Sequence, residues 1–284
     1  MIIRSVSALV LASPLLWLLL AGPSLYLVPL VVLVAMLLAY EWHKLCGPFS
    51  LYHFLWLLFG VLLILSSWIP GLGVTIQAET HTLTRVAWLP LSGLCSLVLL
   101  IFFAEGVLRY RAGQWVLEEV GRRFFGVLYC TLPLALLLEI RHAEQGEWLV
   151  FFLLLTIWAT DIGALFAGRR WGKRKLAPHV SAGKTWVGSL GGVVLASATG
   201  GTVACLCSLP YDWLDATLLG AVLSVVGQMG DLAESLAKRE ANVKDSGQLI
   251  PGHGGVLDRL DSLLFAAPVY YLFLWMHALI PTSP

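Results

Sequence analysis

Long apolar runs, separated by short polar segments, recur along the whole chain. A helix needs about 20 apolar residues to cross the hydrocarbon core of a bilayer, and the runs are close to that length. The pattern predicts an all-α fold, a polytopic helical bundle embedded in a membrane with about nine transmembrane helices. The expected spans cover residues 5–22, 25–40, 51–69, 86–106, 124–140, 148–168, 187–207, 216–236 and 262–280.

The first apolar run resembles a signal peptide because it follows Arg4, but no small-residue cleavage site comes after it. A second apolar run follows at once, so we expect residues 5–22 to remain as a span. About nine spans leave roughly 100 residues for loops, which is too few for a separate soluble domain. We therefore expect residues 1–284 to form one membrane domain.

Lys and Arg residues concentrate in alternate loops. If the N-terminus is cytoplasmic, all but two of the 18 Lys and Arg residues lie on the cytoplasmic side, and only Arg85 and Arg141 lie opposite. Positively charged loops resist translocation across the membrane. The distribution therefore predicts a cytoplasmic N-terminus.

The composition supports a membrane protein, because 58% of the residues are hydrophobic and only 12% are charged. Soluble domains carry about twice that share of charged residues, so a soluble, disordered or coiled-coil protein is excluded. The formal net charge of +1 predicts no nucleic-acid partner. The five cysteines show neither metal-type pairs nor the framework of a secreted protein.

Carboxylates inside a span are costly and usually serve a function. Asp231, Glu234, Ser235 and Lys238 follow one another at i, i+3, i+4 and i+7, so they form one polar stripe on an apolar helix. Such a stripe should face the inside of the bundle. A buried ion pair that only fixes helix packing is the alternative, and it applies most strongly to Asp161 in an earlier span.

The loop at residues 169–186 carries many cations, and we assign most of those from Arg169 to Lys175 to membrane topology. Ser181, Lys184 and Thr185 form the pattern S-x-G-K-T, which combines two hydroxyls, a glycine and an ammonium and suits a phosphate oxygen. The pattern is not a Walker A loop, because the first glycine of that motif is absent.

The loop at residues 237–261 holds acids and bases together. Asp258 and Asp261 lie at i and i+3 where the last span begins, and a glycine-rich turn around His253 precedes them. Carboxylates hold a hard cation that bridges phosphate oxygens, and Lys and Arg neutralise the remaining charge. The composition therefore indicates a site for a divalent metal and a polyphosphate, although a salt-bridged loop could share it.

This constellation resembles the phosphatidate cytidylyltransferase (CDP-diacylglycerol synthase) family, bacterial type. The family signature S-x-x-K-R, K-D-x-G and P-x-H-G-G-x-x-D-R-x-D is matched at Ser235, Lys238, Arg239, Lys244, Asp245, Gly247, Pro251, His253, Gly254, Gly255, Asp258, Arg259 and Asp261. The resemblance weakens in the earlier loop, where Ala182 stands in place of the usual proline and Leu165 in place of an aromatic residue.

The resemblance implies a nucleotidyltransferase that converts CTP and phosphatidate into CDP-diacylglycerol and pyrophosphate. Because the unusual polar residues concentrate after residue 158, we expect residues 1–140 to be mainly structural and residues 148–284 to form the catalytic part. The implied catalytic residues are Lys238, Arg239, Lys244, Asp245, His253, Asp258, Arg259 and Asp261. The implied substrate-binding residues are Ser181, Lys184, Thr185, Ser235, Gly254 and Gly255, and the metal ligands are expected among Asp231, Asp245, Asp258 and Asp261.

The same resemblance implies Mg²⁺ as the cofactor, with a second cation as an open alternative. CTP, phosphatidate and the lipid bilayer are the expected partners, and a homodimer is an open alternative for the assembly. We expect the protein in the bacterial inner membrane, with its active site facing the cytoplasm.

Two other functions remain open from the residues alone. An ion or solute transporter could use Asp161 and Asp231 as an ion path, but it has no need of a cytoplasmic phosphate loop. Another CTP-dependent membrane enzyme, of the polyprenol kinase type, needs a base to deprotonate an alcohol. The CDP-alcohol transferases are disfavoured, because their D-G-x2-A-R pattern is absent.

Overall fold

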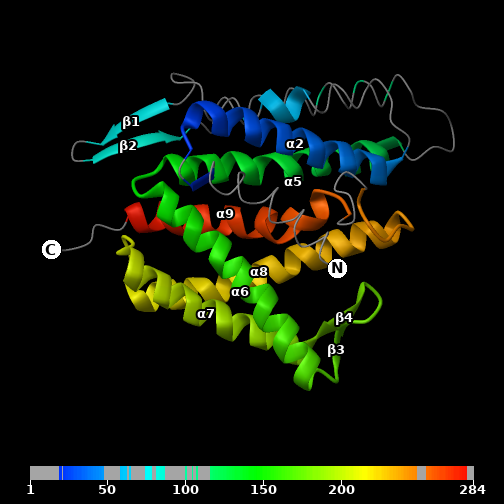
Figure 1. Ribbon diagram of the computed structural model, residues 1–284. Helices are drawn as coiled ribbons and strands as arrows, with labels where there is room; N and C mark the ends of the chain where they lie inside the picture. The colour runs from blue at the N-terminus through cyan, green and yellow to red at the C-terminus, as the bar shows by residue number, and fades with distance from the viewer. Residues whose placement is uncertain are drawn as a thin grey trace. The chain divides into compact units, whose positions relative to one another are not determined.

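The computed structural model describes residues 22–47, 58–62, 74–78, 81–86, 116–247 and 254–279, together with single positions at 19, 20, 64, 100, 104 and 107. Within these ranges the chain is mostly helical (Figure 1). Three expected spans, at residues 5–22, 51–69 and 86–106, lie largely outside the described residues, so the count of about nine stays a prediction.

Six described helices are long and apolar enough to cross a membrane. Each coincides with one of the expected spans, because a long apolar run satisfies its backbone polar groups in lipid only as a helix. The chain is thus an all-α polytopic membrane protein, as predicted. The helices are α2 (Ser24–Cys46), α5 (Val116–His142), α6 (Gly146–Trp171), α7 (Trp186–Cys207), α8 (Trp213–Glu240) and α9 (Leu257–Leu279).

Two helices begin earlier than their apolar runs. Helix α5 starts at Val116, and i,i+4 ion pairs join Glu119 to Arg123 and Glu118 to Arg122 in its first turns. Such pairs stabilise a polar extension that apolar patterning alone does not detect. Helix α9 likewise starts at Leu257, so the acidic residues expected at its entrance belong to the helix itself.

The chain divides into two compact units, one formed by residues 1–27 and 136–284 and the other by residues 28–135. In the second unit, α2 and α5 meet through aromatic side chains. The ring of Trp42 lies 5.3 Å from that of Tyr129, and its Nε1 donates a 3.0 Å hydrogen bond to the Arg122 carbonyl oxygen. These contacts fasten the two helices to each other.

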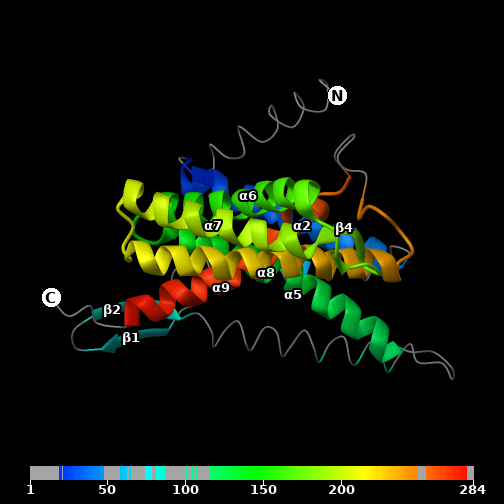
Figure 2. The same cartoon turned by 90° about the horizontal axis from the view of Figure 1, so that it is seen from below.

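The first unit contains α6, α7, α8 and α9, and each of these helices packs against the next one in the chain (Figures 1 and 2). Two antiparallel strands, β3 (Lys175–Ala177) and β4 (Ser181–Thr185), connect α6 to α7. This hairpin occupies a segment that we expected to be a plain loop. A second hairpin, of β1 (Val74–Ala78) and β2 (His81–Val86), belongs to the other unit.

Aromatic side chains close the end of the first unit where α7 turns into α8. The hydroxyl groups of Tyr211 and Tyr270 lie 2.8 Å apart in a hydrogen bond, and Phe152 of α6 packs on both rings. His277 Nε2 lies 2.9 Å from the Pro210 carbonyl oxygen. We call this group the aromatic end; it ties α6 and α9 to the turn before α8.

Arg141, which the charge distribution placed on the non-cytoplasmic side, has a structural role in the same unit. Its Nε donates a 2.7 Å hydrogen bond to the Leu19 carbonyl oxygen, and its Nη2 donates to the carbonyl oxygens of Leu20 and Gly22 at 3.0 and 3.5 Å. Carbonyl groups at a helix end have no partner within the helix, so the guanidinium satisfies them.

Candidate active site

The polar stripe predicted on α8 exists as one connected face. Ser235 Oγ donates to Asp231 Oδ1 at 3.4 Å, and Lys238 Nζ lies 2.5 Å from Glu234 Oε2. The side chain of Glu234 is only 1% exposed. A carboxylate so deeply buried requires a cation nearby, and the helical spacing of the stripe supplies one.

Helix α9 approaches this stripe closely because α8 carries a glycine there. A Cβ atom at Gly230 would lie 2.5 Å from the Asp261 carbonyl oxygen and 3.0 Å from the Phe265 side chain. Any side chain at this position would force the two helices apart. Gly230 therefore lets the first turns of α9 bring Asp261 beside the acids of α8.

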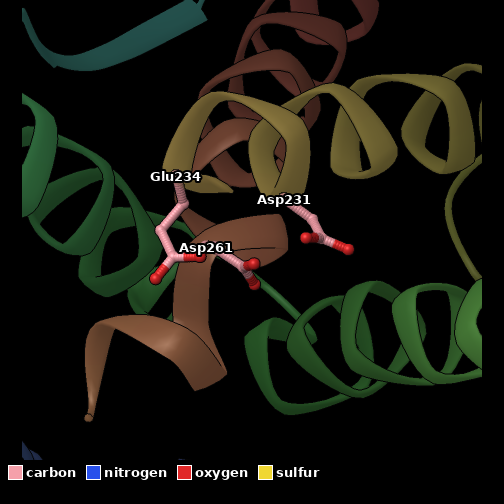
Figure 3. Close-up of side chains that lie close together, drawn as sticks. All are labelled: Asp231, Glu234 and Asp261. Atoms are coloured by element: carbon pink, nitrogen blue, oxygen red, sulfur yellow. The ribbon is translucent and has the colours of Figure 1, made fainter. Parts of the chain in front are cut away.

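Asp231, Glu234 and Asp261 form an acidic cluster, shown in Figure 3, in which one carboxylate oxygen from each residue lies within 4.8 Å of the others. Two of the residues come from α8 and one from α9. Glu234 Oε1 is buried and finds no hydrogen-bond donor among the described residues. Carboxylate oxygens at such spacing are the ligands that hard divalent cations prefer.

Two lysines place positive charge at the edges of the acidic cluster. Lys184 extends from β4, and its Nζ lies 2.5 Å from Asp231 Oδ2 and 3.4 Å from the Gln228 carbonyl oxygen. Lys238 bridges Glu234 Oε2 and Asp258 Oδ1 at 2.5 and 2.6 Å. The ammonium groups offset part of the repulsion among the three carboxylates.

Asp258 lies outside the acidic cluster, and protein donors occupy both of its oxygens. Oδ1 accepts from Lys238, while Oδ2 accepts from Ser246 N, Ser246 Oγ and Gly255 N at 3.0, 3.0 and 2.8 Å. The side chain thereby joins the end of α8, the following loop and the start of α9. A carboxylate with this many donors is well satisfied without a metal.

The glycine-rich turn before α9 has a backbone conformation that requires glycine. Gly254 has a φ of +81°, and a Cβ atom there would lie 2.8 Å from Asp258 Oδ2. The turn can therefore bring the Gly255 amide onto Asp258 only because residue 254 lacks a side chain. His253, one of the expected catalytic residues, lies outside the described residues.

A pocket of about 450 Å³ opens beside the acidic cluster. It lies within the first unit, between the end of α6, the β3–β4 hairpin, the start of α7 and the inner part of α8. Its lining includes both members of the Lys184–Asp231 pair, so the pocket reaches one carboxylate of the cluster. The charged residues that line it are Asp161, Arg169, Lys175, Lys184 and Asp231.

The three residues of the S-x-G-K-T pattern have different surroundings. Lys184 reaches Asp231, whereas Thr185 is buried and caps α7, its Oγ1 accepting a 3.1 Å hydrogen bond from Gly188 N. Ser181 is half-buried at the start of β4. The hydroxyl of Thr185 thus has a helix-capping task that the pattern did not reveal.

The other residues that we expected to be catalytic lie near the protein surface, at the end of the unit that carries the acidic cluster. Arg239 donates from Nε to the Val180 carbonyl oxygen at 3.3 Å, which ties the hairpin to the end of α8. Lys244, Asp245 and Arg259 are exposed. The structure thus leaves Asp245, like Asp258, outside the three-carboxylate group.

The model of the cytidylyltransferase family matches residues 2–277. The chain belongs to the cytidylyltransferase family. It is therefore a membrane nucleotidyltransferase, as its sequence signature led us to expect.

Relatives named phosphatidate cytidylyltransferase are similar over much of the chain. A phosphatidate cytidylyltransferase of Brucella suis is 40% identical over 211 residues, which is 71% of this chain and 77% of the relative. The Bacillus subtilis enzyme of the same name is 42% identical over 158 residues, or 55% and 59% of the two chains. That of Pseudomonas aeruginosa is 40% identical over 179 residues, or 63% and 64%.

Three residues of this cytidylyltransferase gained importance only from the structure. Glu234 belonged to the predicted stripe but not to the expected metal ligands, although its i+3 spacing from Asp231 was a usable signal. Arg169 and Lys175 line the pocket, yet in the sequence they look like the other cations of a cytoplasmic loop. Only their place in the folded pocket, which Arg169 reaches from α6 and Lys175 from β3, separates them from their neighbours.

Proposed function

We propose that this chain transfers the cytidylyl group of CTP to phosphatidate, giving CDP-diacylglycerol and pyrophosphate. The similarity of about 40% to several enzymes named phosphatidate cytidylyltransferase supports this choice of substrates within the family. The match of the segment from Ser235 to Asp261 to the family signature supports it as well.

One observation carries the proposal: three carboxylates and two lysines converge beside an open pocket. Joining two phosphate-bearing substrates requires compensation of their mutual repulsion and alignment of the reacting atoms. A site with acids for a cation and ammonium groups for phosphates meets both needs. A transporter has no comparable use for this arrangement at a helix end.

The reaction is a displacement at the α-phosphorus of CTP. An oxygen of the phosphatidate phosphate forms the new bond to this phosphorus, and the bond from the α-phosphorus to the bridging oxygen of pyrophosphate breaks. The phosphatidate oxygen is already largely ionised at neutral pH, so no strong general base is needed. Lys184 and the cations of the second loop bind and orient phosphate oxygens.

The residues of the acidic cluster fit a divalent cation. Asp231, Glu234 and Asp261 would hold Mg²⁺, and such a ligand role explains why the buried Glu234 Oε1 has no donor among the described residues. Mg²⁺ bound there would supply charge neutralisation for the triphosphate. Asp258 is instead proposed as a positioning residue, because four protein donors already saturate it.

We propose the bacterial inner membrane as the location, with the pocket facing the cytoplasm, where CTP is present. The bacterial relatives and the charge distribution support this placement. The two loops that carry the cations then lie on the same side, and the hydrogen bond from Arg239 to Val180 connects them.

The proposal is tested with purified protein in detergent, Mg²⁺, phosphatidate and CTP labelled at the α-phosphate. We expect a lipid-soluble labelled product, and Asp261→Asn should lower turnover at least about a hundredfold. Asp212→Asn, at the opposite end of α8, is the matched control and should stay active. Absence of product from the wild type, or transfer of a γ-label to a polyprenol instead, refutes the proposed substrate.

A further inference from the structure

Two cations that line the pocket have no acidic partner in the part of the chain that the structure describes. Arg169, near the end of α6, and Lys175, on β3, both line the pocket and are exposed. Among the described residues, no carboxylate lies within ion-pair distance of either side chain. They differ in this respect from Lys184 and Lys238, which are paired with the acidic cluster.

The fold brings these two cations to the same opening. Strand pairing places Lys175 opposite Thr185, so Lys175 lies across the hairpin from the segment that carries Lys184. Arg169 reaches the pocket from the last turns of α6, whose earlier residue Asp161 also lines it. Among the described residues, the lining thus carries three cations against two carboxylates, and Lys184 already pairs with one of those carboxylates.

We propose that Arg169 and Lys175 bind a phosphate group of a substrate at the mouth of this pocket. Unpaired cations at a concave, partly apolar site attract an anion, and an arginine can hold a phosphate with two parallel hydrogen bonds. Within the run of cations from Arg169 to Lys175, these two residues would therefore bind substrate, while those that do not line the pocket serve membrane topology. The inference rests on the proposed function for the identity of the substrate.

The phosphate has two possible sources, the triphosphate of CTP and the phosphate of phosphatidate. Direct binding separates them, and it does not require turnover. Equilibrium binding of labelled CTP and of a fluorescent phosphatidate is measured for the wild type, Arg169→Gln and Lys175→Gln in the same detergent. Each variant removes one positive charge from the pocket mouth.

Matched controls come from the same run of cations. Arg170→Gln and Lys173→Gln remove the same charge from exposed residues that do not line the pocket. Because all four positions are exposed, we expect the variants to fold, and thermal unfolding checks this. Lys175→Arg keeps the charge and should retain wild-type binding.

We expect Arg169→Gln and Lys175→Gln to weaken binding of one of the two ligands about tenfold, and the controls to change it less than twofold. Weaker CTP binding assigns the pair to the nucleotide, and weaker phosphatidate binding assigns it to the lipid. Equal effects of pocket and control variants, or no effect on either ligand, overturn the inference. A protein that binds both ligands but makes no product refutes the proposed function alone.

Discussion

The ammonium group of Lys238 donates a 2.6 Å hydrogen bond to Asp258 Oδ1 and thereby joins the last turns of α8 to the first turn of α9. The two side chains are 12% and 11% exposed, and the same ammonium also bonds the buried Glu234. Two carboxylates from different helices thus share one cation. This single positive charge is therefore one direct link between α8 and α9.

Replacing Lys238 with glutamine should lower the free energy of unfolding by about 3 kcal/mol, because two partly buried carboxylates then lose their counter-charge. Chemical unfolding in detergent, followed by tryptophan fluorescence, measures the change. Lys244→Gln removes a charge from an exposed position and should change stability by less than about 0.5 kcal/mol. Similar stabilities of the two variants would contradict the bridging role.

Replacing Glu234 with glutamine should weaken metal binding at least about tenfold. Mutation of a residue that only hydrogen-bonds to a metal ligand already has an effect of about that size, so loss of a ligand should cost no less. Mn²⁺, used as a spectroscopic substitute for Mg²⁺, reports the affinity by paramagnetic resonance without any turnover. Glu240→Gln, on the exposed end of the same helix, is the control. Unchanged Mn²⁺ affinity in Glu234→Gln would remove this residue from the ligand set.

Replacing Gly230 with alanine should destabilise the protein by about 1–3 kcal/mol, because the new methyl group meets the Asp261 carbonyl oxygen and pushes α9 away from α8. The same displacement widens the acidic cluster, so Mn²⁺ affinity should fall too. Gly121→Ala is the matched control: open space surrounds residue 121 of α5, and alanine there should add up to about 1 kcal/mol of stability.

Replacing Arg141 with glutamine should lower stability by about 2 kcal/mol, because the carbonyl groups of Leu19 and Leu20 lose a charged donor. Arg122→Gln serves as the comparison. Arg122 is 49% exposed and lies 4.0 Å from Glu118, so its loss should cost less than about 0.5 kcal/mol. Equal unfolding midpoints for the two variants would argue against the capping role of Arg141.

The orientation of the pocket can be tested with single cysteines in a background without the five native ones. A cysteine at Lys173, near the hairpin, should react with a membrane-impermeant maleimide only from the cytoplasmic side. A cysteine at Asp212, at the aromatic end, should react only from the opposite side. Labelling of both positions from one side would refute the predicted topology.

Apolar patterning predicted the described helices well, because run length alone decides whether a segment can cross a bilayer. It placed the starts of α5 and α9 too late, since ion pairs and capping bonds, which it does not register, extend both helices into polar sequence. The β3–β4 hairpin was missed for a related reason. Its two strands are only three and five residues long and follow no alternating pattern of apolar and polar residues.

The acidic cluster was only partly predictable. Helical spacing put Asp231 and Glu234 on one face of α8, but the approach of Asp261 depends on the contact at Gly230, which spacing does not show. The motif grouped Asp258 with Asp261, whereas their surroundings differ: one is saturated by donors and the other faces the cluster. The motif thus indicates which residues lie near the site, whereas the contacts of each side chain depend on how the helices pack.

The aromatic end and the acidic cluster lie at opposite ends of the same helices. Interlocked rings and the Tyr211–Tyr270 hydrogen bond hold α6, α9 and the α7–α8 turn together at one end. The other end is held by charges and by single hydrogen bonds to a small hairpin. The end that carries the pocket is therefore the one whose contacts added salt would weaken, because exposed charges are screened by salt and packed rings are not.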